Sequence, residues 1–211
     1  MAQRIAIVDY GMGNLRSVQK ALAHVAPSAA IAITADPGAI LAADRVVFPG
    51  QGAMPDCMKC LAASGLGEAV REAASSKPFL GLCIGLQMLF ERSDEGDTPG
   101  LAILPGEILA FSRAESTRQA RLKIPHMGWN EAWQARPHPL WKGIADGARF
   151  YFVHSFYCVP REESLTAAVS RYPHAFTSAI SRDNIFATQF HPEKSSAAGL
   201  TLLENFASWA P

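Results

Sequence analysis

The chain has 211 residues, 49% of them hydrophobic, and its 19 Lys and Arg residues balance 19 Asp and Glu residues. These values predict one domain over residues 1–211 with a sizeable core, and the neutral charge argues against the clustered positive charge that sequence-independent nucleic-acid binding requires. The longest apolar run, residues 79–90, is shorter than the roughly 20 residues of a membrane-spanning helix, so we expect a cytoplasmic protein with no nucleic-acid or membrane partner.

The first hundred residues alternate between predicted strands and predicted helices. A helix is expected after Asn14, whose side chain can cap it, because apolar residues then recur on one helical face. A second helix is expected over residues 68–75. Strands are predicted at residues 4–9, 30–34, 45–48 and 78–82. This alternation predicts a doubly wound, mostly parallel sheet with helices on both faces, an α/β fold of the flavodoxin-like kind.

The second half of the chain predicts an added antiparallel section. Residues 91–100 are polar and contain Gly and Pro, which indicates a surface loop. Ser195 can cap a last helix whose Leu202, Phe206 and Trp209 share one face. Short β-like runs separated by turns are expected at residues 108–111, 121–124, 150–153, 165–169, 175–180 and 185–190.

Two cysteines, Cys57 and Cys60, have the spacing of a redox motif or of half a zinc site. A zinc site needs a second close pair, which Cys83 and Cys158 do not form. A thioredoxin-like motif opens a helix directly after a strand, whereas residues 49–54 intervene here. We therefore interpret this pair as ordinary helix thiols, with the redox motif as the alternative, and we expect no metal site and no cofactor.

The segment 81–85 reads Gly-Leu-Cys-Ile-Gly between a predicted strand and an apolar helix expected to run to about residue 91. This pattern is that of a nucleophile elbow with Cys in place of Ser. A sharp strand-to-helix turn would hold Cys83 in strained backbone angles at the helix N-terminus, where backbone N–H groups favour a thiolate. The alternative is a buried core cysteine at the start of a helix.

A His-Pro-Glu segment follows the last predicted strand and provides a candidate base. Glu193 lies two residues after His191, close enough to hold one tautomer of its ring and to stabilise the imidazolium. Pro192 keeps His191 out of helical angles. Without the cysteine elbow, a simple turn would be the better interpretation.

A third candidate lies at the end of the strand over residues 45–48. Ligands of open α/β sheets bind outside the carboxyl ends of the strands. Gly50, Gln51 and Gly52 could therefore turn a backbone N–H toward a developing oxyanion, with the Ile84 N–H as the second donor. The alternative is a tight turn without a catalytic role.

Taken together, these motifs resemble the class I (triad) glutamine amidotransferases. Residues 81–87 match the family pattern G-x-C-x-G-x-Q, and residues 191–193 match H-P-E. The resemblance implies L-glutamine as substrate, with Cys83 as nucleophile, His191 as acid and base, Glu193 as its orienting group and Gln87 as a substrate contact. Gln51 departs from the small apolar residue often found in the family's oxyanion strand.

Four further blocks, residues 9–17, 125–130, 151–155 and 189–195, are similar to the branch of this family that supplies ammonia to a cyclase in L-histidine biosynthesis. The resemblance implies a heterodimer with a (β/α)₈ barrel cyclase subunit. It also implies Asn14, Arg16 and Trp129 as residues of the partner interface. The alternatives are another cysteine hydrolase on this fold, a glutaminase for a different acceptor, and a binding module without chemistry.

Overall fold

The computed structural model describes residues 2–120 and 122–211, without the side chains of residues 117, 118 and 120. The α-helices are α1 Leu15–Val25, α2 Pro37–Ala42, α3 Met54–Ser64, α4 Gly67–Ser76, α5 Ile84–Gln87, α6 Glu115–Ala120 and α7 Ser196–Ser208. The strands are β1 Arg4–Val8, β2 Ala30–Thr34, β3 Arg45–Gly50, β4 Phe79–Cys83, β5 Arg92–Ser93, β6 Thr98–Pro99, β7 Gly106–Ala110, β8 His126–Gln134, β9 Ala148–His154, β10 Phe156–Pro160, β11 Thr166–Arg171, β12 Ala175–Arg182 and β13 Ile185–Thr188. Short 3₁₀ turns connect several of these elements.

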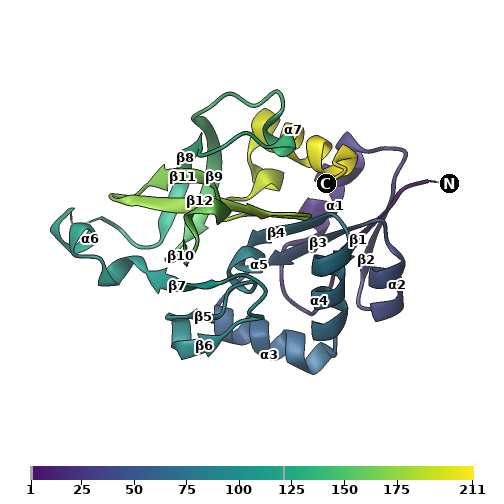
Figure 1. Cartoon of the computed structure of the whole chain (residues 1–211), viewed down its shortest axis with the longest axis horizontal. Coiled ribbons are helices and arrows are strands. Elements are labelled where there is room, and N and C mark those ends of the chain that lie inside the picture. The colour runs from purple at the N-terminus through teal and green to yellow at the C-terminus, as the bar shows by residue number, and fades with distance from the viewer. Residues whose placement is uncertain (1, 121) are drawn as a thin grey trace.

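The parallel part of the sheet has the strand order β2-β1-β3-β4-β13 (Figure 1). In this arrangement Gly50 of β3 is in register with Cys83 of β4, and Thr188 of β13 is in register with Leu82. The carboxyl ends of β3, β4 and β13 therefore meet at one edge. This is the edge at which the sequence places its three chemical motifs.

The sheet continues beyond β13 with mostly antiparallel strands. Strand β12 pairs antiparallel with β13 and with β10, and β10 pairs antiparallel with β7. A branch of β11, β8 and β9 leaves from β12 and stands beside the main sheet in Figure 1. The predicted α/β fold, a mostly parallel sheet with an added antiparallel section, is confirmed.

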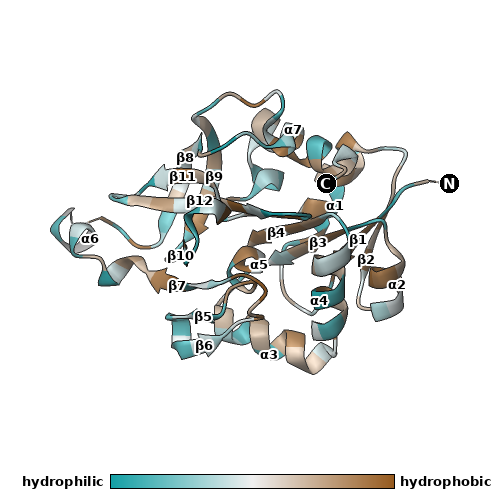
Figure 2. Ribbon diagram, in the orientation of Figure 1, coloured by the Kyte–Doolittle hydropathy of each residue, from teal (hydrophilic) through white to brown (hydrophobic). Residues whose placement is uncertain are grey.

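Helices cover both faces of the parallel strands because successive side chains of a strand point to opposite faces. On β1, Ile5 and Ile7 pack with Leu22 of α1 on one face, and Ala6 packs on the other face with Val70 of α4. In Figure 2 the hydrophobic colour lies along β4 and α5 in the interior, while the outer turns of α4 are hydrophilic. The buried strands thus read as continuous apolar runs, as expected for parallel strands.

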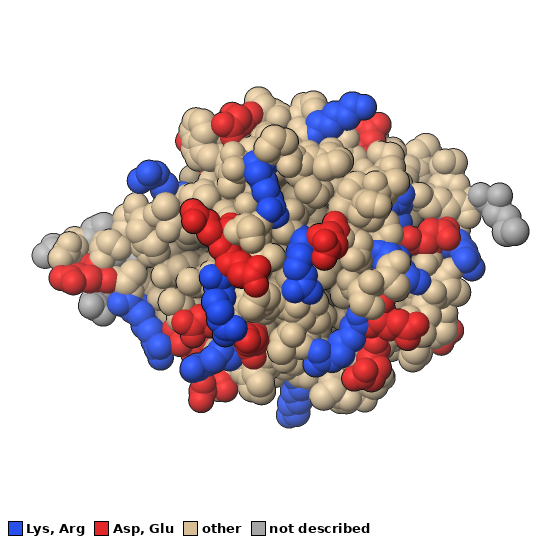
Figure 3. Space-filling view, viewed as in Figure 1, with Lys and Arg blue, Asp and Glu red and all other residues tan. Residues whose placement is uncertain are grey.

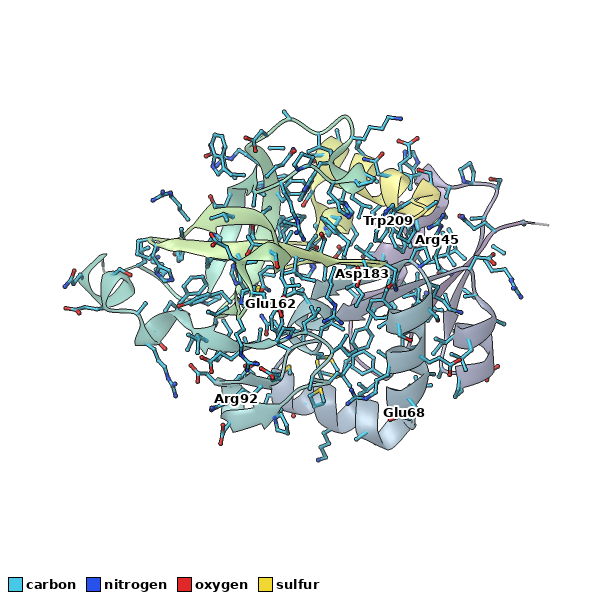
Figure 4. All side chains as sticks on the ribbon, in the orientation of Figure 1. Arg45, Glu68, Arg92, Glu162, Asp183 and Trp209 are labelled. Carbon is cyan, nitrogen blue, oxygen red and sulfur yellow. The ribbon has the colours of Figure 1, made fainter. Side chains whose placement is uncertain are left out.

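The C-terminal end of the chain is tied to β3. The Arg45 guanidinium donates a hydrogen bond to the Trp209 carbonyl and lies 5.9 Å from the Phe206 ring centroid. Figure 4 shows Arg45 and Trp209 together beside α7. Burial lowers the pKa of Arg45, and the nearby Asp44 opposes this effect. The contact fixes α7 against the sheet.

Several predicted details differ from the structure. The helix after Cys83 ends at Gln87 because residues 101–104 turn back and donate backbone hydrogen bonds to carbonyls of residues 88–90. The predicted surface loop 91–100 contains the short strands β5 and β6. Of the predicted strand 121–124, residue 121 lies outside the described residues and residues 122–124 form no strand.

The two predicted helix caps also differ. Asn14 occupies the position before α1 but its side chain makes no capping hydrogen bond. Ser195 occupies the position before α7, yet its hydroxyl donates to the His191 carbonyl at 2.6 Å and accepts from the Tyr151 N–H at 2.9 Å. Ser195 therefore holds the segment after β13 instead of capping the helix.

Strand β8 was not anticipated, because its hydrophobic pattern is reversed. Met127, Trp129 and Trp133 are 61%, 45% and 49% exposed, whereas His126 on the other face is buried.

Among the described residues, no helix is long and apolar enough to cross a membrane. On the face shown in Figure 3, positive and negative side chains are intermingled.

Candidate active site

Cys83 lies at the sharp turn between β4 and α5. Its φ of 55° and ψ of −111° are an uncommon backbone conformation for a residue other than glycine, and the side chain is buried. Strand β3 approaches the turn so closely that both surfaces carry a glycine at the contact. A Cβ on Gly85 of α5 would overlap the Phe48 carbonyl oxygen, and a Cβ on Gly50 of β3 would lie 2.7 Å from the Gly85 nitrogen. The predicted elbow is therefore present in the backbone.

His191 and Glu193 interact directly. The His191 Nδ1 lies 2.9 Å from Glu193 Oε1, and the two side chains are only 6% and 2% exposed. The His191 backbone N–H donates to the Tyr151 carbonyl at 3.0 Å, which ties the segment after β13 to β9. The carboxylate thus fixes the proton of the ring on Nδ1 and leaves Nε2 for Cys83.

The charge state of His191 depends on Cys83. Burial lowers the pKa of His191, but the negative charge of Cys83 and the contact with the Glu193 carboxylate together raise this pKa to about 10. An ionised Cys83 is therefore accompanied by a protonated imidazolium. Such a thiolate–imidazolium pair contains both the nucleophile and the proton donor that acyl transfer needs.

The segment predicted to bind an oxyanion runs past Cys83. Gln51, Gly52 and Ile84 line the same cavity as Cys83, and Gly52 has a φ of +108°. The Cys57 thiol donates to the Gln51 carbonyl at 3.5 Å, so the Gly52 N–H of the same planar peptide points away from α3. Cys57 lies on α3 and is buried, as predicted for a helix thiol.

Gln87 is buried one helical turn after Cys83. Its Nε2 donates to Gln189 Oε1 at 3.0 Å and approaches the Phe156 carbonyl at 3.4 Å. Its Oε1 is buried and has no hydrogen-bond partner among the described residues. This oxygen can accept a hydrogen bond from a ligand in the cavity, and the substrate contact at Gln87 stays a prediction.

Gln189 was not among the predicted site residues. Its Nε2 lies 3.8 Å from the Cys83 sulfur, and the residue is fully buried. The sequence carried a signal for it, because in an extended segment Gln189 lies two residues before His191 and so points to the same face. The structure brings both side chains to Cys83.

The cavity over Cys83 has a volume of about 330 Å³. Glu95 and Lys194 contribute one negative and one positive side chain to its lining, and His154 and Phe156 form part of its wall. A wider groove of about 680 Å³ near Tyr157 contains none of the predicted site residues. Within the described part of the chain, no group of three or more His, Cys, Asp or Glu residues could hold a metal ion.

The three predicted interface residues lie outside this cavity. Asn14 directly precedes α1 and is partly exposed, and Arg16 lies in the first turn of α1 and is exposed. The neighbouring Met12 side chain would be 3.0 Å from a Cβ on Gly52, so this segment adjoins the predicted oxyanion segment. Trp129 lies on a different element, β8, where its ring contacts Tyr151.

The fold and this site define a glutamine amidotransferase. The model of the glutamine amidotransferase class-I family matches residues 6–209, and the chain belongs to this family. It is an enzyme with glutaminase activity.

Among its relatives, imidazole glycerol phosphate synthase subunit HisH of Aromatoleum aromaticum is 61% identical over 98% of this chain and 99% of its own length. The protein of the same name from Nitrosospira multiformis is 60% identical over 98% of both chains. The structure of PurLQS from Thermotoga maritima has a TM-score of 0.73 at 17% identity and covers 99% of both chains. The glutaminase domain of CTPS from Trypanosoma brucei has a TM-score of 0.64 at 14% identity, covering 100% of this chain and 96% of that one.

Proposed function

We propose that this chain is the glutaminase subunit of an imidazole glycerol phosphate synthase, and that residues 1–211 form its one amidotransferase domain. In this function it hydrolyses L-glutamine to glutamate and ammonia in L-histidine biosynthesis. Full-length relatives at 56–61% identity that are named as HisH subunits support the assignment. The observation that carries the chemistry is the buried His191–Glu193 contact of 2.9 Å beside Cys83.

The first half of the reaction forms a thioester. The Cys83 thiolate attacks the side-chain amide carbon of glutamine, and the carbonyl oxygen becomes an oxyanion. The Ile84 N–H and a backbone N–H of residues 50–52 stabilise it. The imidazolium of His191 gives its Nε2 proton to the departing nitrogen, so ammonia leaves and a γ-glutamyl thioester remains on Cys83.

The second half releases glutamate. Neutral His191 removes a proton from water, which attacks the thioester carbon, and the C–S bond breaks to restore the Cys83 thiolate. Glu193 holds the His191 ring in one orientation through both steps and stabilises its protonated form. The chemistry uses side chains and backbone of this chain alone.

Charged groups of the cavity suit an amino acid. Glu95 can attract the α-ammonium group of glutamine, and Lys194 can attract its α-carboxylate. The unpaired Oε1 of Gln87 can accept a hydrogen bond from the substrate amide nitrogen. These contacts support a free amino acid with an amide side chain as the substrate.

The ammonia is proposed to pass to a cyclase subunit, the (β/α)₈ barrel HisF, in a heterodimer. The cyclase would use it to make imidazole glycerol phosphate and aminoimidazole carboxamide ribonucleotide. Asn14, Arg16 and Trp129 are the proposed interface residues, and their exposure supports this role. The cysteines are free thiols, which supports a reducing compartment, the cytoplasm.

The test is glutamine hydrolysis by this chain alone and then with a cyclase subunit and its ribonucleotide ligand. We expect a low rate that rises sharply in the complex and is abolished in Cys83→Ala. A high rate that is indifferent to the cyclase would retain the glutaminase but reject the histidine pathway. Glutaminase activity surviving in the purified Cys83→Ala protein would reject the proposed nucleophile.

A further inference from the structure

Two buried histidines next to the candidate active site are not used by the proposed reaction. His126 on β8 and His154 on β9 are in register, and His126 Nδ1 lies 2.8 Å from His154 Nε2. His154 also forms part of the wall of the cavity over Cys83. The His126 ring is stacked between Tyr172 and Phe152, at centroid distances of 4.1 and 5.0 Å, so its plane is fixed.

The hydrogen bonds of this pair have one direction. The Phe156 carbonyl can only accept, so His154 Nδ1 donates to it at 2.7 Å. Burial lowers the pKa of His154 to about 3 and that of His126 to about 4, so both rings are neutral at neutral pH. His154 Nε2 must then accept from His126 Nδ1, and His126 Nε2 must accept from the Asn130 amide nitrogen at 3.2 Å.

The Phe156 carbonyl links this pair to the nucleophile, because it accepts hydrogen bonds from both sides. The Phe156 carbonyl also accepts from Gln87 Nε2 at 3.4 Å, and this nitrogen donates to Gln189 Oε1 at 3.0 Å. Gln189 Oε1 is therefore an acceptor, which turns Gln189 Nε2 toward the Cys83 sulfur at 3.8 Å. A single hydrogen-bonded chain thus connects Asn130, a partly exposed residue of β8, with Cys83.

We propose that Asn130, His126 and His154 are positioning residues, which hold the Phe156 carbonyl and through it orient Gln87 and Gln189 around Cys83. The proposal rests on the proposed glutaminase function of this site. Each neutral ring has one donor and one acceptor, so the Phe156 carbonyl at one end and the Asn130 amide nitrogen at the other together select which nitrogen of each ring carries the proton. An acceptor at residue 130 would reverse the two histidine tautomers and remove the donor that His154 offers to the Phe156 carbonyl.

Asn130→Asp tests this directly, because a carboxylate accepts where the amide donates. A neutral His126 would turn its N–H to residue 130, His154 would have to donate from Nε2, and His154 Nδ1 would then face the Phe156 carbonyl without a proton. We expect kcat/KM for glutamine to fall about tenfold at pH 8.5, the effect of a lost buried hydrogen bond. Asn130→Ala should lose no more than about threefold, because water can reach this partly exposed position and donate instead.

The pH profile separates this effect from a general structural one. A protonated His126 can donate from both nitrogens, so the Asn130→Asp variant should approach Asn130→Ala as pH falls and diverge from it as pH rises. Among the described residues, the titratable groups that face this pair are Tyr172 after β11, which stacks on His126, and His191, which lies close to His154. Met127→Glu adds a charge on the opposite, exposed face of β8 and should leave the profile of the wild type unchanged.

Nitrogen-15 NMR of the ring nitrogens gives a readout independent of activity. In the wild type, His126 and His154 should both carry the proton on Nδ1, and in Asn130→Asp at pH 8.5 it should move to Nε2. Protonation on Nε2 in the wild type would overturn the proposal, as would an Asn130→Asp variant that matches Asn130→Ala at every pH. If the wild type hydrolyses no glutamine even with its cyclase, the proposed function fails instead, and the ring nitrogens still report whether the chain has this direction.

Discussion

The amide nitrogen of Gln189 lies 3.8 Å from the sulfur of Cys83. Gln189 and His191 both belong to the segment that follows β13. An N–H group at this position stabilises a thiolate, and hydrogen bonds to charged groups contribute about 1.5–3 kcal/mol. Gln189→Leu should therefore lower kcat for glutamine by at least about tenfold, with a smaller change in KM, in steady-state assays. Unchanged kcat in a folded Gln189→Leu protein would show that this contact has no part in the chemistry.

Removal of Cys83 should change the titration of His191. The charge of Cys83 is the largest of the contributions that raise the His191 pKa to about 10 against the effect of burial. In Cys83→Ala, we expect NMR titration to give a clearly lower pKa for His191. An unchanged pKa would mean that Glu193 alone holds the proton on this ring.

The same shift predicts how stability depends on pH. The pKa of His191 in the folded wild type lies above the roughly 6.5 of an unfolded chain. Its protonated form therefore stabilises the fold fully below about pH 6.5, and this contribution is lost as pH rises toward 10. Urea unfolding between these pH values should show a flatter dependence in Cys83→Ala than in the wild type.

Glu193 is expected to act through the orientation of His191. In Glu193→Gln the amide can donate to Nδ1, which leaves the proton on Nε2 and removes the acceptor that the reaction needs. We expect kcat to fall by about 10²–10⁴, in the range seen when other triads lose their carboxylate. Alkylation of Cys83 measured against pH, with Glu193→Asp as the variant that retains the charge, would show whether the loss follows the state of His191. A loss of kcat with an unaltered alkylation profile would contradict this role.

Gly85 should be intolerant of a side chain, because a Cβ there would overlap the Phe48 carbonyl oxygen. Gly85→Ala must push β3 away from the elbow, and we expect it to lower the free energy of unfolding by about 2 kcal/mol or more. Gly67→Ala is the matched control. A Cβ on Gly67 meets nothing within 4 Å, and at the start of α4 alanine should stabilise by about 0.4–1 kcal/mol. Urea denaturation compares the two, and equal stabilities would contradict the close approach seen here.

The alternation of buried strands with helices and the elbow could be predicted from the sequence because their causes are local. Each buried strand is a short apolar run bounded by turns, and a strand-to-helix turn needs glycine on both sides of its central residue. The His-Pro-Glu segment is equally local, since residues 191 and 193 contact each other within one extended stretch. Such signals involve residues close in the chain, and no knowledge of the fold is needed to read them.

The contacts between distant segments follow from the tertiary packing and not from local sequence. The length of α5 depends on residues 101–104, and the role of Ser195 depends on Tyr151 of β9. Strand β8 has polar residues on its inner face because the buried partner of His126 is His154, on another strand. Gln189 reaches Cys83 across a separation of 106 residues. A hydrogen bond between distant residues satisfies polar groups only after the chain has brought them together, so its existence follows from packing and not from a local pattern of hydrophobic residues.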